Sequence, residues 1–359
     1  MSGSNLFRLL NLNPCDEEHR KLLDGDAIIR EVQKDPRSID LFYTFSDGSR
    51  CLPLYQAIKL RAPLCVIEVL CSPTALKEKG DDGYTANQLK PKRMRDFVEF
   101  LMDRHPQAIE EKSIYRCTPL HLACQSQSSL KLVSLLLDRW PDALREKSND
   151  GFTPLHVASA TRASLELIML LVDHWPDALM EKTNYGYSPL HVATRKKAPL
   201  EVVAFLIDCH PDSLKMKTNH GHTPLHLACR SQAPLEVVLL LLERMPEVMM
   251  ERCNHGETPM DIARLTNEPN DARKLVSLAS SLYKGEMNNP LAEESIGLFT
   301  KIQWWYGIAW VLNEHPAVAQ NINVHIKIIP NFLSMVGRSC NKKTLWHILC
   351  NKQDLFKDI

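Results

Sequence analysis

The chain has 359 residues, of which 44% are apolar and 24% charged, a composition typical of folded proteins and not of disordered ones. Its 43 basic and 43 acidic side chains cancel, so no overall charge favours nucleic acid or an anionic membrane surface as a partner. This length accommodates two or three ordinary domains or one array of repeats, and only the internal spacing of motifs decides between them.

The cysteines and the N-terminal sequence predict an intracellular protein, either cytoplasmic or nuclear. The 11 cysteines are an odd number and include no C-x-x-C pair, which favours a reducing compartment. The start of the chain lacks the charged, apolar and small-residue regions of a signal peptide. The most apolar run, 237–242, is far shorter than the ~20 residues that span a bilayer, so we expect no membrane segment.

Residues 1–46 are predicted to form an N-terminal helical cap. Two helical patterns, at about 18–24 and 27–35, precede the first repeated motif without a clear hairpin between them. We therefore expect this segment to cover the first unit of the array that follows.

A tetrapeptide recurs through the middle of the chain. T-P-L-H begins at Thr118, Thr153 and Thr223, S-P-L-H begins at Ser188, and T-P-M-D begins at Thr258, so neighbouring copies are 35 residues apart. Two weaker copies precede them at steps of 33 residues, at 52–55 and 85–88. We interpret residues 47–283 as an array of about seven repeats.

Each repeat is predicted to contain a turn, a short helix and a longer antiparallel helix. The leading Thr or Ser caps the first helix and the following Pro supplies the φ angle of its first turn. Five positions after the cap the residue is Ala in six of the seven units, which predicts a close helix contact there. A proline ends the second helix, and Asn-x-Gly triplets such as 149–151 form the turn tips between units.

The T-P-L-H-x-A signature resembles the ankyrin repeat, a turn followed by two helices in about 33 residues. This resemblance covers roughly residues 47–283. It implies an all-α helical repeat solenoid with a helical C-terminal extension, whose concave face binds partner proteins. The sequence departs from the family pattern by one extra residue between the helices and another before the closing proline, so we expect slightly longer helices.

Four histidines and several cysteines were considered as chemical sites. His121, His156, His191 and His226 recur three residues after the cap. The resemblance implies that each of these rings ties the first helix to neighbouring backbone. The pairs of His121 with Cys124 and of His226 with Cys229 are three repeats apart, roughly 30 Å at ~10 Å per helix layer, so they share no metal.

Other signatures of catalysis are absent from the sequence. There is no phosphate-binding glycine loop, nucleophile elbow or H-E-x-x-H helix, and the S-x-x-K match at 128–131 lacks its companion motifs and is better explained as a capped helix start. We therefore predict no enzyme activity, no cofactor and no metal.

The C-terminal part is predicted to contain a linker at 284–290 and a helical segment at 291–359. Helical patterns lie near 295–313 and 331–338. Trp304, Trp305 and Trp310 fit a core at helical spacing or a partner-binding face, and the former is more common. Residues 344–350 echo residues 118–124, which indicates a cap or a degenerate repeat.

These features favour a protein–protein interaction scaffold that binds its partner through the concave face of the repeats. The alternative is a regulatory or targeting subunit of an enzyme complex that docks through the C-terminal segment. Nucleic acid and membranes are not expected as partners.

The candidate binding surface follows from the family resemblance, because ankyrin proteins generally use their turn tips and the inner face of the first helix. The aromatic and imidazole residues at the tips are Tyr84, Tyr115, Phe152, Tyr185, Tyr187, His220, His222 and His255, and the adjoining basic helix residues are Arg195, Lys196 and Arg230. Such a surface suits an acidic or phosphorylated segment, although tips and charges of this kind also occur as ordinary solvated faces. Histidine at the tips would make binding sensitive to pH between about 6 and 7.

Three further expectations concern packing. Ala158 and Ala193 should be buried between helices. The unit at 85–91 keeps its leading Thr, but its first helix lacks the signature Pro, Leu, His and Ala and is stopped by Pro91, so it should open first, with the fastest hydrogen exchange among the repeats. The segment from Gly285 onward should cover the far side of the last repeat, since its apolar residues Ile296, Leu298, Phe299 and Trp304 need a partner surface.

Overall fold

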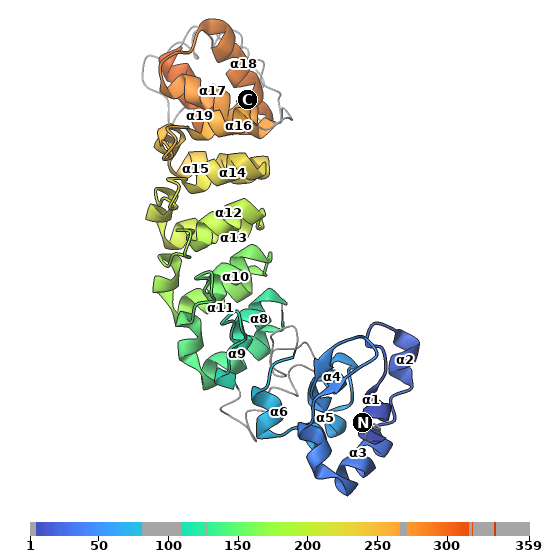
Figure 1. The fold of residues 1–359 in the computed structure, drawn as a ribbon. Helices are drawn as coiled ribbons and strands as arrows, with labels where there is room; N and C mark the ends of the chain where they lie inside the picture. The colour runs from blue at the N-terminus through green and yellow to red at the C-terminus, as the bar shows by residue number, and fades with distance from the viewer. Residues whose placement is uncertain are drawn as a thin grey trace. The chain divides into compact units, whose positions relative to one another are not determined.

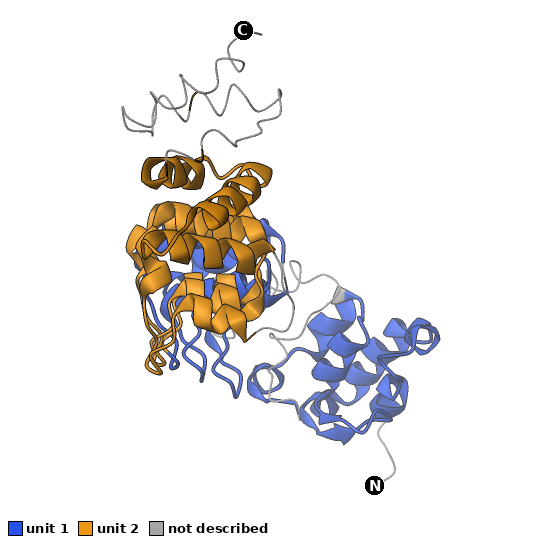
Figure 2. Cartoon of the chain, turned by 90° about the horizontal axis from the view of Figure 1, so that it is seen from above, with its two compact units in different colours: residues 1–185 blue, residues 186–359 orange. Residues whose placement is uncertain are grey.

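The computed structural model describes residues 5–80, 109–126, 128–265 and 271–315, together with residues 318 and 334. It is an all-α repeat structure that divides into two compact units, residues 1–185 and 186–359 (Figure 1, Figure 2). The predicted weak unit at 85–91 and the helical pattern at 331–338 lie outside the described residues, apart from residue 334.

The first unit begins with the segment that we predicted as a cap. Its elements are α1 (Asn5–Leu10), α2 (Glu17–Lys21), α3 (Gly25–Lys34), η1 (Pro36–Asp40), β1 (Tyr43–Thr44), β2 (Arg50–Cys51), α4 (Pro53–Lys59), α5 (Leu64–Leu70) and α6 (Pro73–Lys77). The two-residue strands are antiparallel, with Tyr43 opposite Cys51. The helices α1, α3, α4 and α5 share a buried core that includes Leu6, Ile28, Leu54 and Val66.

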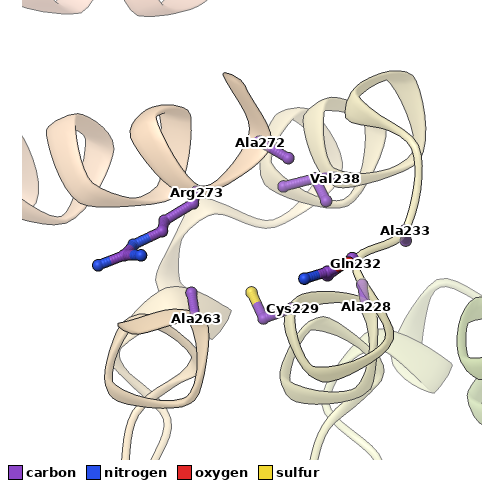
Figure 3. A pocket seen from close by; sticks show the side chains of 8 residues that line it. All are labelled: Ala228, Cys229, Gln232, Ala233, Val238, Ala263, Ala272 and Arg273. Atoms are coloured by element: carbon purple, nitrogen blue, oxygen red, sulfur yellow. The ribbon is translucent and has the colours of Figure 1, made fainter. Parts of the chain in front are cut away.

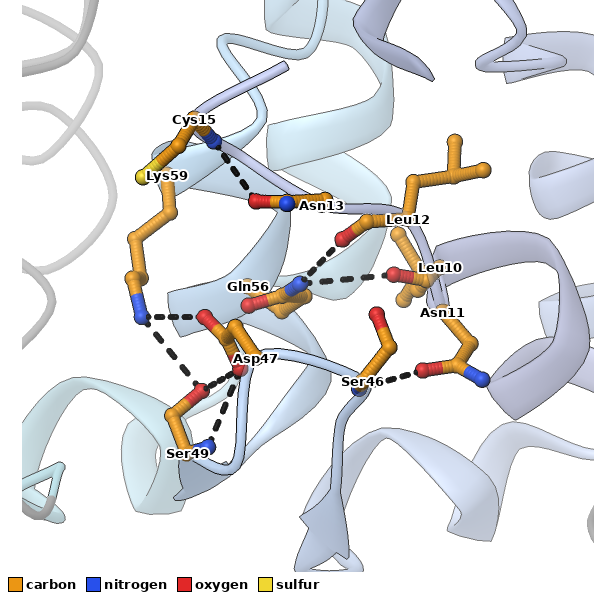
Figure 4. A network of polar contacts seen from close by, with 10 residues as sticks. All are labelled: Leu10, Asn11, Leu12, Asn13, Cys15, Ser46, Asp47, Ser49, Gln56 and Lys59. Atoms are coloured by element: carbon orange, nitrogen blue, oxygen red, sulfur yellow. Dashed lines mark hydrogen bonds and ion pairs between the residues drawn. The ribbon is translucent and has the colours of Figure 1, made fainter.

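Polar contacts also tie the N-terminal helix to the first repeat (Figure 4). The Gln56 side chain in α4 donates from Nε2 to the backbone oxygen of Leu12 at 3.0 Å, and the backbone N–H of Ser46 donates to the Asn11 side chain at 2.7 Å. The Lys59 ammonium lies 2.9 Å from the Asp47 carboxylate in the turn between β1 and β2. These bonds join the turn and both neighbouring helices across distant parts of the sequence.

The later repeats in both units follow one pattern of a short first helix, a ten-residue second helix and a 3₁₀ turn. In the first unit these elements are α8 (Pro119–Gln125), α9 (Leu130–Arg139), η4 (Pro141–Arg145), α10 (Pro154–Ala160), α11 (Leu165–His174) and η5 (Pro176–Leu179). In the second unit they are α12 (Pro189–Lys196), α13 (Leu200–Cys209), η6 (Pro211–Leu214), α14 (Pro224–Ser231), α15 (Leu235–Arg244) and η7 (Pro246–Met250), followed by α16 (Pro259–Arg264) and α17 (Asp271–Tyr283).

The repeated residues take the positions that their chemistry predicts. Thr153 caps α10 by accepting the backbone N–H of His156, and Pro154 is the first helical residue. Ala158 and Ala193 are completely buried, as predicted, and so leave no room for a larger side chain. The second helices end one residue before Trp140 and Trp175, where a proline follows and a 3₁₀ turn begins.

One backbone feature was not predicted. The residues that end the first helices in a left-handed conformation are not glycines but Arg162, Lys197 and Gln232, with φ between 52° and 56°. A side chain makes this conformation less favourable by roughly 1 kcal/mol, because Cβ approaches the following carbonyl oxygen. All three side chains are exposed to solvent.

The turn tips of neighbouring repeats are joined by asparagine side chains. Within the first unit, Asn184 donates from Nδ2 to the backbone oxygen of Asn149 at 2.7 Å, and Asn149 donates to Ile114 at 2.9 Å. Within the second unit, Asn254 donates to Asn219 at 2.9 Å. The triplets that begin at Asn149, Asn184 and Asn254 therefore each form both a turn and a contact with the previous turn.

In the described part of the second unit, two helices follow the repeats, α18 (Asn289–Lys301) and α19 (Trp305–Glu314). The predicted linker at 284–290 is shorter in the structure, because Asn288 caps a helix that starts at Asn289. The pattern expected at 295–313 is divided between these two helices. Residues 316–359, on which the docking alternative largely depends, lie outside the described residues except for 318 and 334.

α18 packs against both α17 and α19, and the Trp310 ring of α19 lies 5.8 Å from the Tyr283 ring of α17. The Lys301 ammonium pairs with Asp271 at 2.9 Å, and Lys274 pairs with Glu294 at 2.7 Å. The apolar residues Ile296, Leu298, Phe299 and Trp304 are all buried.

Candidate functional site

The tip residues and the ends of the first helices come together because each turn leads directly into its helix. We number positions from the capping Thr or Ser of each repeat. Position minus one precedes the cap, and position plus seven lies at the end of the first helix. These two positions hold Tyr187 and Arg195, then His222 and Arg230, then Glu257 and Leu265 in successive repeats of the second unit.

In the first unit the predicted aromatic tips do not have one common environment. Tyr115 and Tyr185 are about half exposed, at 49% and 52%. Phe152 is half-buried and packs edge-on against the ring of His156, with 5.8 Å between centroids. Tyr84, the remaining predicted aromatic tip, lies outside the described residues.

At the start of the second unit an aromatic ring and a cation form a direct contact. The guanidinium carbon of Arg195 lies 5.3 Å from the centre of the Tyr187 ring, within the range of a cation–π interaction. The ring holds the Arg195 side chain beside the tip, and Lys196 follows it as an exposed residue. The predicted combination of aromatic and basic residues is therefore present in this repeat.

The next two repeats enclose an open groove of about 590 Å³. His220, His222 and His255 from the tips and Arg230 from α14 line it, as four of the residues predicted from the sequence. Three further lining residues were missed, namely Glu257, Ile262 and Leu265. Glu257 and Leu265 occupy the same two positions as the predicted residues, so the repeat register could have identified them.

The three groove histidines differ in burial. His220 and His255 are exposed, whereas His222 is only 7% exposed and its ring lies 6.1 Å from that of His220. Burial lowers the pKa of His222, and the positive charges of Arg230, His220 and His255 lower it further, while Glu257 acts in the opposite direction. The pKa of His222 therefore lies below the ordinary histidine value on which the predicted pH window of about 6 to 7 is based.

Three basic residues on this side of the second unit lack carboxylate partners within the described chain, although Arg264 in α16 pairs with Asp261 at 3.7 Å. Among the described residues, none forms an ion pair with Arg195, Lys196 or Arg230. By contrast, basic residues near the second helices and 3₁₀ turns of the same unit are paired, in Lys215–Glu247, Lys217–Glu251 and Arg244–Asp208 at 2.7–3.4 Å. In the described second unit, unpaired positive charge therefore lies on the side formed by the turn tips and the first helices.

The recurring histidines of the first helices have a structural role. The backbone N–H of Thr118 donates to His121 Nδ1 at 3.2 Å, so the ring proton is on Nε2, which lies 2.9 Å from the Phe152 backbone oxygen in the next repeat. His226 lies in the same way 3.2 Å from the backbone oxygen of Glu257. Burial is the main cause that lowers the pKa of His121 and His226 to about 4, which keeps both rings neutral.

The cysteines beside these histidines are equally inert. Burial raises the pKa of Cys124 and Cys229 to about 12, so neither supplies a thiolate near neutral pH. Cys229 borders a cavity of about 10 Å³ between α14 and α16 (Figure 3), which has room for about one water molecule. Within the described parts of the chain, no cluster of three or more His, Cys, Asp or Glu side chains is suited to hold a metal.

A comparison with protein families decides the classification. The model of ankyrin repeats (3 copies) matches residues 86–177, 141–217 and 199–284, which together span more than half of the chain. The chain belongs to the ankyrin-repeat family. Ankyrin repeats are generally modules for protein–protein interaction and are typically not enzymes. A search of curated proteins found no match for this ankyrin-repeat chain.

Of the helices in the described ranges, none combines the length and the apolar character needed to cross a bilayer.

Proposed function

We propose that this ankyrin-repeat protein is a scaffold that holds an acidic or phosphorylated segment of a partner protein against its turn tips and first helices. The observation that carries the proposal is the exposed set of Arg195, Lys196 and Arg230, which have no ion-pair partner among the described residues. Charged nitrogens of this kind form strong hydrogen bonds with carboxylate or phosphate oxygens. The aromatic face of Tyr187 and the imidazole groups beside them add contact area typical of interfaces.

The test is a combined variant carrying Tyr185→Ala, Tyr187→Ala, Arg195→Ala and Arg230→Ala. Partners are identified for the native chain by proximity labelling and mass spectrometry, and their recovery is then measured for the variant. We expect a loss of recovery without a change in helical content, since all four side chains are at least partly exposed. Full recovery by the folded variant would place the interface elsewhere.

A matched control removes basic residues from a different side of the second unit. Lys215→Ala and Arg244→Ala delete two exposed positive charges that already have carboxylate partners. We expect this control to retain the partners. Phosphatase treatment before recovery separates the two chemical sources, because only a phosphorylated segment loses affinity on treatment.

A further inference from the structure

The surface changes its chemistry in one direction across the last three repeats of the array. At position plus seven the residues are Arg195, Arg230 and Leu265, so two cations are followed by an aliphatic side chain. Leu265 is 71% exposed, so its aliphatic side chain is available to contact a bound segment. The first two repeats of this series therefore favour negative groups, and the last favours an apolar group.

Position minus one changes in the same direction. Tyr187 is followed by His222 and then by Glu257, whose charge acts on His222 across the groove. Glu257 precedes α16 and Leu265 follows it, so the repeat that offers an apolar contact also carries a negative charge that repels a carboxylate. Arg230, His220 and His222 belong to the preceding repeat, whereas His255 belongs to the same repeat as Glu257 and Leu265. The groove is thus lined by the cation Arg230 on α14, and by the buried Ile262 on α16 with the exposed Leu265 directly after that helix.

The distance between neighbouring first helices determines how far apart the matching residues must lie in the sequence of a bound segment. The helices α12, α14 and α16 are packed side by side in order (Figure 1). Equivalent positions on adjacent packed helices are about 10 Å apart, and an extended chain advances about 3.3 Å per residue. An extended segment that crosses the first helices therefore presents a new residue to the same position of each repeat about every three residues.

We propose that the groove binds an extended segment in which an aliphatic residue lies three positions from an acidic residue. The aliphatic side chain contacts Leu265 and Ile262, and the acidic group pairs with Arg230. A second acidic residue three positions further on pairs with Arg195. Glu257 disfavours an acidic residue in place of the aliphatic one. This inference rests on the proposed function, since it assumes that the partner lies across the first helices.

The experiment uses the full chain and fluorescein-labelled nine-residue peptides on a Gly-Ser background. Each peptide carries one Glu and one Leu at a separation of one to six residues, in both orders, and a parallel set carries phosphoserine in place of Glu. Fluorescence anisotropy gives Kd for each peptide. We expect the tightest binding at a separation of three in at least one order, and the two sets distinguish a carboxylate from a phosphate.

Two substitutions test the assignment of each end of the groove. Arg230→Ala should weaken the best peptide about tenfold and leave a peptide that has Leu but no Glu unchanged, since one charged hydrogen-bonding partner is lost. Leu265→Arg should reverse the preference, so that a peptide with two Glu residues three apart binds more tightly than the Glu–Leu peptide. Arg139→Ala, an exposed arginine at the end of α9, is the control and should change neither affinity.

The outcomes separate this inference from the proposed function. If the combined tip variant loses its partners while the peptides show no dependence on separation, the spacing rule is wrong and the proposed function stands. If the same peptides bind equally well to the Leu265→Arg chain, the apolar end of the groove is wrongly assigned. If partner recovery is unaffected and no peptide binds, both proposals fail.

Discussion

Two glycines in equivalent turns allow the contact between neighbouring tips to be measured directly. Gly186 and Gly256 have the same left-handed backbone, with φ of 79° in both cases. A Cβ atom on Gly186 would lie 2.5 Å from Asn219 Oδ1 and 2.6 Å from the Asn219 backbone nitrogen, whereas a Cβ on Gly256 would meet nothing within 4 Å. Alanine at either site thus introduces the same backbone strain, but only at position 186 does its Cβ also meet a neighbouring turn tip.

The expected costs follow from this difference. Gly256→Ala should lower the free energy of unfolding by about 1 kcal/mol, the cost of a left-handed conformation for a residue with Cβ. Gly186→Ala carries that same cost and must also displace the backbone of Asn219, and overpacking of this kind costs about 1–3 kcal/mol more. We therefore expect a total of about 2–4 kcal/mol for Gly186→Ala.

The measurement is urea unfolding of the native chain and both variants, followed by far-ultraviolet circular dichroism. Hydrogen exchange of the Gly221 amide, which donates to the Thr218 backbone oxygen at 2.9 Å, reports the neighbouring turn separately. We expect this amide to exchange faster in Gly186→Ala but not in Gly256→Ala. Equal destabilisation by the two substitutions would refute the argument that contact between tips holds adjacent repeats together.

Further predictions concern packing, pH and the C-terminal helices. Ala158→Glu should destabilise the first unit by at least about 3 kcal/mol, because a carboxylate would replace a fully buried methyl group, and an unchanged thermal melt would contradict the packing. The pKa of about 4 for His121 and His226 lies below the ordinary 6.5, so between these values the unfolded chain binds more protons than the folded chain. The free energy of unfolding should therefore fall as pH decreases from about 6.5 to 4, by up to ~3 kcal/mol per histidine. Urea titrations at pH 7 and pH 4.5 should show this fall, and replacing both residues with Gln should reduce it. Lys197→Gly should raise the unfolding midpoint by relieving a left-handed conformation worth about 1 kcal/mol, and a lower midpoint would show that the Lys197 side chain contributes more than the strain costs. Removal of residues from Gly285 onward should lower both solubility and the melting temperature, since it uncovers α17, and an equally stable truncated chain would show that α18 and α19 are independent of the repeats.

The repeat fold could be predicted from the sequence because its determinants are local and recur. Thr153 and Pro154 start a helix through contacts within four residues, and Ala158 marks a close helix contact by its recurrence. The first-helix histidines also take the structural role that the family resemblance implied. These features are determined by residues within one repeat and by their recurrence at a fixed spacing.

The groove could not be predicted in full, because it depends on differences between repeats. Glu257 and Leu265 interrupt the pattern of their positions, and a search for aromatic and basic residues passes over them. The burial of His222 likewise depends on the turn, where its backbone N–H donates to Thr218 Oγ1 at 3.1 Å and fixes the direction of the side chain. His220, two residues earlier, is exposed, so two histidines of similar sequence context have different environments.

The residue before each closing proline also differs in fluorescence between the two units. Trp140 and Trp175 occupy this position in the first unit, whereas His210 and Met245 occupy it in the second. The Arg145 guanidinium lies 5.9 Å from the centre of the Trp175 ring, so loosening of that repeat changes the surroundings of a fluorophore. Indole emission from these two residues therefore reports on the middle of the chain, while the fully buried Trp304 reports on the end formed by α18 and α19. Trp→Phe substitutions can leave either the Trp140 and Trp175 pair or Trp304 as the fluorophore. Comparing the unfolding transitions of these variants by tryptophan emission then shows whether the array unfolds first at its C-terminal end or in its middle.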